Sequence, residues 1–146
     1  MSDDVPKRSG DPTVLVSDRQ TEPLDGALVG TLVGFVERTL AGEGLGDVEL
    51  SLSFVDAEEM AELHERYLGE PGPTDVLAFP LGEDGLLGDV IVCPTVAAGN
   101  NPERDAELRL LVVHGTLHLL GYDHEDDGER AVMWRKQEAY SGVVVP

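Results

Sequence analysis

Three of the four histidines, His114, His118 and His124, lie within a segment of eleven residues. If residues 103–120 form a helix, His114 and His118 stand one turn apart on the same face, so both imidazoles point toward one place. Gly121 can then end the helix in the left-handed conformation, and the chain can turn back to bring His124 to that place. The spacing therefore predicts a metal site with three nitrogen ligands and an open fourth position.

The spacing of the histidines and of the glycine matches the long zinc-peptidase signature H-E-x-x-H-x-x-G-x-x-H. One position departs from it, because Gly115 stands where a peptidase carries the glutamate that takes a proton from the metal-bound water. The ligands of a peptidase are present and its base is missing. A metallopeptidase is therefore the less favoured interpretation.

Two further interpretations explain the histidines without catalysis. Histidines on an apolar helix face often belong to the core, and a zinc ion can be purely structural. A structural zinc site usually has four protein ligands, often cysteines, whereas the single cysteine of this chain, Cys93, is distant in the sequence. An open, catalytic type of site is the favoured prediction.

The length of 146 residues and the hydrophobic content of 41% are typical of a soluble protein with one domain. We expect residues 1–11 to form a disordered N-terminal tail and residues 12–146 to form the domain. No uninterrupted apolar stretch is long enough to span a bilayer, and a single cysteine excludes an intramolecular disulfide. These features predict a cytoplasmic protein that does not bind a membrane.

The formal net charge of −19 repels polyanions and argues against a protein that coats nucleic acid or anionic membrane. Five of the ten lysines and arginines nevertheless follow Pro102, so a local basic rim near the histidines is compatible with the sequence. Aromatic residues make up only 5% of the chain, and Trp134 and Tyr140 lie at core-like helical positions. A broad stacking surface for RNA is therefore not expected.

Hydrophobic periodicity and turn residues predict the order of the elements. Strands are expected over residues 13–17, 48–55, 74–80 and 86–93, and helices over about 25–41, after Asp56, after Pro94, over 103–120 and over 129–140. Gly88 marks a bulge or a close backbone approach in the last strand. Because strands and helices are mixed rather than strictly alternating, the predicted class is α+β, with one mixed sheet of about four strands packed with helices.

Three motifs follow one another in the chain: P-T-D-V-L-A-F-P at 73–80, L-G-D-V-I at 87–91 and H-G-T-L-H-L-L-G-Y-D-H at 114–124. With them the chain resembles the YbeY family of metal-dependent endoribonucleases over nearly all of its length beyond the tail. The resemblance implies a zincin-like site in which His114, His118 and His124 bind one Zn²⁺ per chain. It also implies cleavage of single-stranded RNA in 16S rRNA 3′-end maturation and ribosome quality control, with the ribosome or ribosomal proteins as partners.

One departure from the family pattern concerns the binding of phosphate. Many members carry Tyr-Arg before the turn that leads to Pro-Thr-Asp, whereas this chain has Tyr67 and Leu68. Arg66 lies two residues before Leu68 on a helix, so it should face roughly the opposite side. An alternative interpretation is therefore a metal-stabilised, ribosome-associated adaptor with little nuclease activity.

A base would assist RNA cleavage, and two carboxylates are candidates. Glu107 lies seven residues before His114, on roughly the same helical face, and Asp123 lies beside the third histidine. Either could instead orient a ligand imidazole, or serve only as a solvated helix-start carboxylate or a loop cap. The fourth histidine, His64, lies in a helix of alternating charge and is expected to be exposed.

Overall fold

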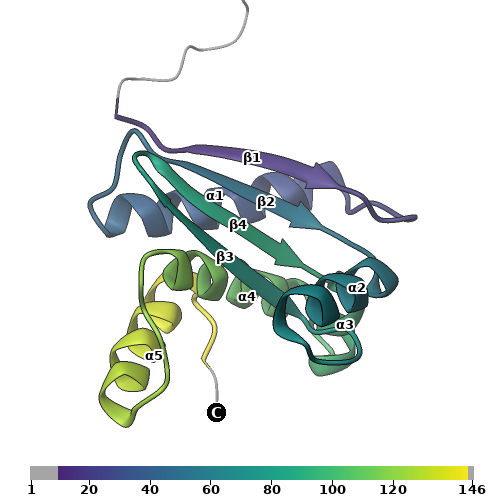
Figure 1. Cartoon of the computed structure of the whole chain (residues 1–146). Coiled ribbons are helices and arrows are strands. Elements are labelled where there is room, and N and C mark those ends of the chain that lie inside the picture. Colours follow the sequence, from purple (N-terminus) through teal and green to yellow (C-terminus); the bar gives the residue numbers. More distant parts are fainter. Residues whose placement is uncertain (1–9, 145–146) are drawn as a thin grey trace, which may run out of the picture.

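The computed structural model describes residues 10–144 (Figure 1). Residues 1–9, most of the predicted tail, lie outside the described residues, as do residues 145 and 146. The elements in chain order are β1 (Thr13–Asp18), α1 (Gly26–Gly42), β2 (Glu49–Phe54), α2 (Ala57–Leu68), β3 (Val76–Glu83), β4 (Leu86–Val92), α3 (Pro94–Asn100), α4 (Arg104–Leu119) and α5 (Asp127–Ser141). The predicted strands and helices are all present, with ends shifted by a few residues.

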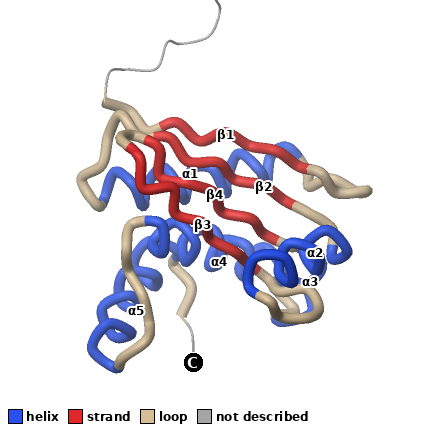
Figure 2. The backbone as a smooth tube through the Cα atoms, in the orientation of Figure 1, coloured by secondary structure: helices blue, strands red, loops and turns tan. Residues whose placement is uncertain are grey.

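The four strands form one mixed sheet in the order β1-β2-β4-β3. β1 pairs with β2 and β2 with β4 in parallel, whereas β3 pairs with β4 in the antiparallel direction. The predicted α+β class with a mixed four-stranded sheet is confirmed. Because β3 lies at an edge of the sheet, one side of its backbone faces away from the other strands (Figure 2).

The main core lies between the sheet and the helices α1 and α4. In β2 the alternation is strict: Leu50, Leu52 and Phe54 are fully buried, and the residues between them face the opposite side of the sheet. The buried residues of α1 and α4 belong to the same hydrophobic cluster. A smaller cluster, which includes Met60 and Leu77, lies on the opposite face beneath α2. The sheet therefore holds α4, with its histidines, in a fixed position.

Gly88 permits a close approach between β4 and β3, as predicted. Its φ is +132°, and a Cβ there would overlap the backbone oxygen of Phe79. The pairing of β2 with β4 also shifts register between Glu49 and Leu50, next to this glycine. Both observations confirm the predicted bulge or close approach.

The expected exposure of His64 is wrong. Its side chain is only 12% exposed, and its Nε2 lies 3.3 Å from a carboxylate oxygen of Glu70. Its Nδ1 donates to the backbone oxygen of Gly72 at 2.8 Å. His64 thus links α2 to the turn that precedes β3.

Within residues 10–144, no helix combines the length and the apolar character that crossing a membrane requires.

Candidate metal centre

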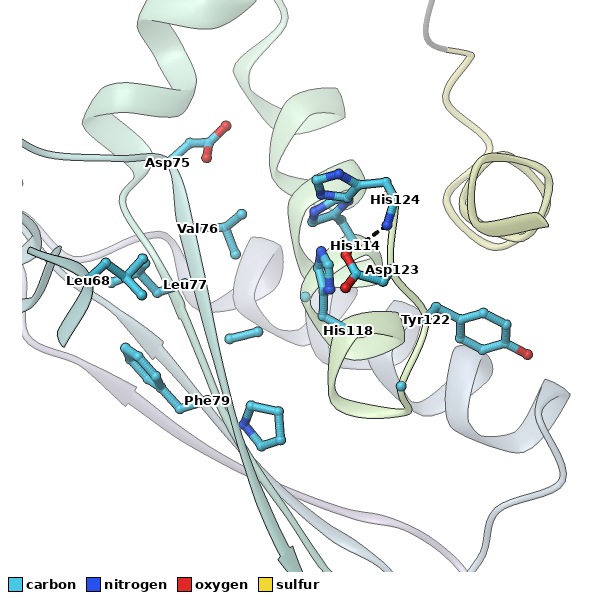
Figure 3. A pocket seen from close by; sticks show the side chains of 14 residues that line it. Leu68, Asp75, Val76, Leu77, Phe79, His114, His118, Tyr122, Asp123 and His124 are labelled. Atoms are coloured by element: carbon cyan, nitrogen blue, oxygen red, sulfur yellow. Dashed lines mark hydrogen bonds between the residues drawn. The ribbon is translucent and has the colours of Figure 1, made fainter. Parts of the chain in front are cut away.

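The three histidines converge as their spacing predicts (Figure 3). His114 and His118 come from α4 and His124 from the loop that follows it, and one ring nitrogen of each lies within 4.8 Å of the others. The ring centroids of His114 and His118 are 4.6 Å apart, and those of His118 and His124 are 5.2 Å apart. Gly121, with φ +96°, makes the turn between helix and loop. These residues form a group that could hold a metal ion.

A residue of α5 sets the orientation of His114. Gln137 is 3% exposed, and its Oε1 accepts a hydrogen bond of 2.7 Å from Nδ1 of His114. With Nδ1 protonated, Nε2 of His114 keeps a free lone pair. Trp134, also on α5, packs edge-on against His114 and His124, with ring centroids 6.1 and 5.6 Å away. α5 therefore holds two of the three imidazoles.

Both histidines on α4 are shifted toward the neutral form that binds metals. Burial lowers the pKa of His114, and the nearby imidazoles of His118 and His124 lower it further, against the raising effect of Gln137. Burial and then the His124 imidazole lower the pKa of His118. Because metal ions bind neutral imidazole, these donors fit a zinc ion.

The loop that carries His124 is tied to two distant helices through Glu43. The hydroxyl of Tyr122 donates to Oε1 of Glu43 at 2.5 Å. Lys136 and the hydroxyl of Tyr140, both on α5, donate to Oε2 at 2.9 and 2.5 Å. The Glu43 side chain is only 10% exposed. We call these four residues the Glu43 network; it joins the end of α1, the histidine loop and α5.

Gln137 and Glu43 were not predicted from the sequence. Gln137 could have been noticed as a polar residue on the buried stripe that Met133, Gln137 and Ser141 form at intervals of four. Glu43 lies in the glycine-rich segment after α1, where the sequence indicates only a helix end. The hydrogen-bond partners of Glu43 are 79 to 97 residues away in the sequence, and no local pattern predicts such contacts.

The two candidate bases lie in different places. Asp123 lines the cleft beside the histidines, and its Oδ1 accepts from the backbone N–H of His124 at 2.7 Å. Glu107 is not among the described residues that line the cleft. Burial and the charge of Asp75 raise the pKa of Glu107, against hydrogen bonds from Asn101 and Asn100 that lower it. Of the two carboxylates, only that of Asp123 is beside the three histidines.

The histidines open onto a cleft of about 500 Å³. Its other wall includes the edge strand β3 and the end of α2, where Leu68 is 55% exposed. Arg66 lies in a separate hollow with Glu58 and Glu62, so it faces away from the cleft as predicted. Among residues 10–144, no lysine or arginine lines the cleft.

The family model described as Endoribonuclease YbeY matches residues 17–143. The chain belongs to this family. Proteins named Endoribonuclease YbeY from Cutibacterium acnes and Streptomyces coelicolor are each 48% identical to it, over 102 and 109 residues. These matches cover 60% and 62% of this chain and 66% of each relative, so the chain spans just under two thirds of their length.

A solved structure is similar to this chain in fold. The solution structure of TM1509 from Thermotoga maritima is similar with a TM-score of 0.66 and 34% sequence identity. The similarity covers 88% of this chain and 87% of that one. The match to the family model and the named relatives confirm the resemblance to the YbeY family that the three motifs indicate.

Proposed function

We propose that this YbeY-family protein is a zinc-dependent endoribonuclease that cleaves single-stranded RNA. The observation that carries the proposal is the convergence of three imidazoles beside an open cleft. The names of the relatives support the reaction class. The donor set supports zinc, because three nitrogen ligands with an open fourth position are typical of catalytic zinc sites.

The metal and the protein would divide the chemistry between them. When bound, zinc supplies Lewis acidity toward a phosphoryl oxygen and lowers the pKa of a water molecule to about 7. His114, His118 and His124 would hold the ion, one per chain. Gln137 would keep Nε2 of His114 directed at it by accepting the proton of Nδ1.

Asp123 is the better placed of the two proposed bases. Its carboxylate lines the cleft, and the hydrogen bond from the His124 backbone fixes its position. It could accept a proton there, or it could orient the histidine loop. Glu107 would act indirectly, because its side chain is hydrogen-bonded to Asn100, which in turn donates to Asp75 in the cleft wall.

We further propose that the substrate in the cell is 16S rRNA, in 3′-end maturation and ribosome quality control in the cytoplasm. Ribosomal proteins are then the expected partners, because their basic surfaces suit a chain with a net charge of −19. This part of the proposal rests on family membership, and it involves no membrane.

The deciding experiment is cleavage of a labelled single-stranded RNA, with chelator, with zinc added back, and with His118→Ala. Cleavage that stops with chelator, returns with zinc and is absent in the variant supports the proposal. His64→Ala is the matched control, because His64 lies outside the ligand group and should leave one zinc per chain. Undiminished zinc content in His118→Ala would contradict the ligand assignment.

A ribosome-associated adaptor with little nuclease activity is the second candidate. The leucine at position 68 and the absence of cations among the described lining residues favour it. It predicts a zinc-loaded protein that binds ribosomal components and does not cleave RNA. A metallopeptidase is less favoured, because Gly115 cannot act as the base, and absence of peptide hydrolysis would dismiss it.

A further inference from the structure

The cleft continues beyond the metal centre, across the outer edge of β3. Figure 3 shows the three histidines on one side of this strand and Leu68 and Phe79 on the other. Tyr67 contacts Phe79, with ring centroids 5.2 Å apart and planes at 57°. Tyr67 and Leu68 are 58% and 55% exposed. We call Tyr67, Leu68 and Phe79 the apolar rim.

We propose that the apolar rim is a nucleobase-stacking subsite that holds the base of a nucleotide next to the phosphate at the metal centre. The inference rests on the proposed function and adds the way in which the substrate is held. An exposed tyrosine against a phenylalanine offers an aromatic face, and any unpaired base can stack on such a face. The rim contains one aromatic pair, which suits a single base and agrees with the low aromatic content of the chain.

Charge supports a base rather than a phosphate at the rim. RNA-binding proteins usually gain affinity from lysine and arginine contacts to phosphates. This chain has a net charge of −19, and the lining of the cleft includes neither residue type within residues 10–144. Inside the cleft, apart from the metal centre, the described lining residues can therefore hold RNA only through uncharged contacts. Leu68 and Phe79 of the apolar rim line the same cleft as the histidines, so the rim adjoins the metal centre.

The same arrangement favours single-stranded RNA. Bases in a duplex are stacked on one another and cannot present their faces to a protein, whereas unpaired bases can be splayed out onto aromatic side chains. The free edge of β3 lies between the rim and the histidines, so its backbone N–H and C=O groups could hydrogen-bond with the edge of a bound base. The rim would thus contribute to selectivity for unpaired RNA.

The test is equilibrium binding of a dye-labelled, single-stranded 2′-O-methyl RNA to the zinc-loaded full chain, with the RNA checked for integrity afterward. Tyr67→Ala should weaken binding by about tenfold, the typical loss of one base–aromatic stack. Tyr67→Phe keeps the ring and should bind within about twofold of the original protein. Leu15→Ala, which removes an exposed apolar side chain from β1, is the matched control and should change nothing.

An oligonucleotide with abasic sites supplies the second arm. Removing the stacked base should weaken RNA binding to the original protein as much as Tyr67→Ala does. The variant and the abasic RNA combined should lose little more affinity than either change alone. The loss should persist at high salt, because stacking releases no counterions. An unchanged melting temperature of Tyr67→Ala would exclude misfolding as the cause of its weaker RNA binding.

Three outcomes overturn the inference: no binding by the original protein, equal binding by Tyr67→Ala, or additive losses from the variant and the abasic sites. Equal binding would favour an apolar protein segment as the occupant of the rim. Base-dependent binding without cleavage of ordinary RNA would retain the subsite and contradict the proposed nuclease. Failure of the inference and failure of the proposed function are therefore distinguishable.

Discussion

At the scale of single residues, Gln137 decides which nitrogen of His114 is left free to bind the proposed metal ion. Its Oε1 can only accept, so Nδ1 of His114 donates and Nε2 stays free. Gln137→Leu should weaken zinc affinity by about 10- to 100-fold, the usual effect of losing a hydrogen-bond partner of a ligand histidine. Competition for zinc with a chromogenic chelator measures this affinity.

A conservative variant separates this role from packing. Gln137→Glu keeps an acceptor oxygen at the same place, so it should retain most of the affinity that Gln137→Leu loses. Equal loss in both variants would mean that Gln137 acts through the core, where it is buried beside Met133.

A second residue-scale prediction concerns Leu68 at the mouth of the cleft. Leu68 lines the cleft with its side chain 55% exposed, so an arginine there can reach a bound phosphate. Leu68→Arg should raise the rate of RNA cleavage and steepen the salt dependence of RNA binding by about one unit of log–log slope. Cleavage rates and binding titrations over a range of salt measure both effects.

Leu68→Gln is the matched control for Leu68→Arg, because it replaces the leucine with a polar side chain that carries no charge. Both variants remove the same apolar side chain from the rim, so a rate in Leu68→Arg no higher than that in Leu68→Gln would mean that phosphate is held from elsewhere. The direction in which position 68 points was predictable, since helical geometry separates it from Arg66. The partner of His114 was not predictable, because Gln137 is 23 residues away.

At the scale of elements, the sequence predicted most of the fold because its signals are local. The alternation in β2, the glycine that follows α4 and the spacing of His114 and His118 each act within a few residues. Contacts between elements carry no such local signal. The helix expected after Asp56 does begin there, yet the Asp56 side chain accepts from Thr21 rather than from the first turn of α2.

Gly115 shows how the packing of α4 on the sheet limits the chemistry of the site. A Cβ at this position would lie 2.6 Å from Cγ1 of Val90 and 3.4 Å from Cγ2 of Val76. In the peptidase signature a glutamate stands at the position of Gly115. In this chain, that side of α4 therefore packs directly against β3 and β4. Glycine there allows the helix to approach the strands closely.

Gly115→Ala should lower the free energy of unfolding by about 1–3 kcal/mol, because the added methyl overpacks this contact. Gly30→Ala is the control: it lies in α1 with nothing within 4 Å of an added Cβ, and it should gain about 0.5–1 kcal/mol. Urea unfolding measures both values. Equal stabilisation by the two alanines would show that α4 can move away from the sheet at no cost.

At the scale of the whole molecule, the Glu43 network joins three regions that are far apart in sequence. Its carboxylate receives hydrogen bonds from the histidine loop and from α5. Gly42 leaves room for the ring of Tyr140 in the network, because a side chain at position 42 would overlap that ring. The position of His124 therefore depends on α1 and α5 as well as on α4.

The ionisation of Glu43 makes this coupling dependent on pH. Burial alone would raise the pKa of Glu43, but the hydrogen bonds from Tyr122, Tyr140 and Lys136 outweigh it and hold the pKa below its ordinary value of 4.5. A carboxylate whose pKa is lower in the folded state stabilises the fold above its unfolded pKa. That contribution is lost as the pH falls through the folded pKa.

Glu43→Gln should therefore lower the free energy of unfolding at pH 7 by about 1–3 kcal/mol, the cost of weakening hydrogen bonds to a charged group. The difference from the original protein should shrink as the pH falls below 4.5, where the native carboxylate also becomes protonated. Urea midpoints over this range measure the difference. Glu138→Gln, on the exposed side of α5, removes the same charge outside the network and should show little effect at any pH. A pH-independent difference for Glu43→Gln would show that the network acts through packing rather than through the charge of Glu43.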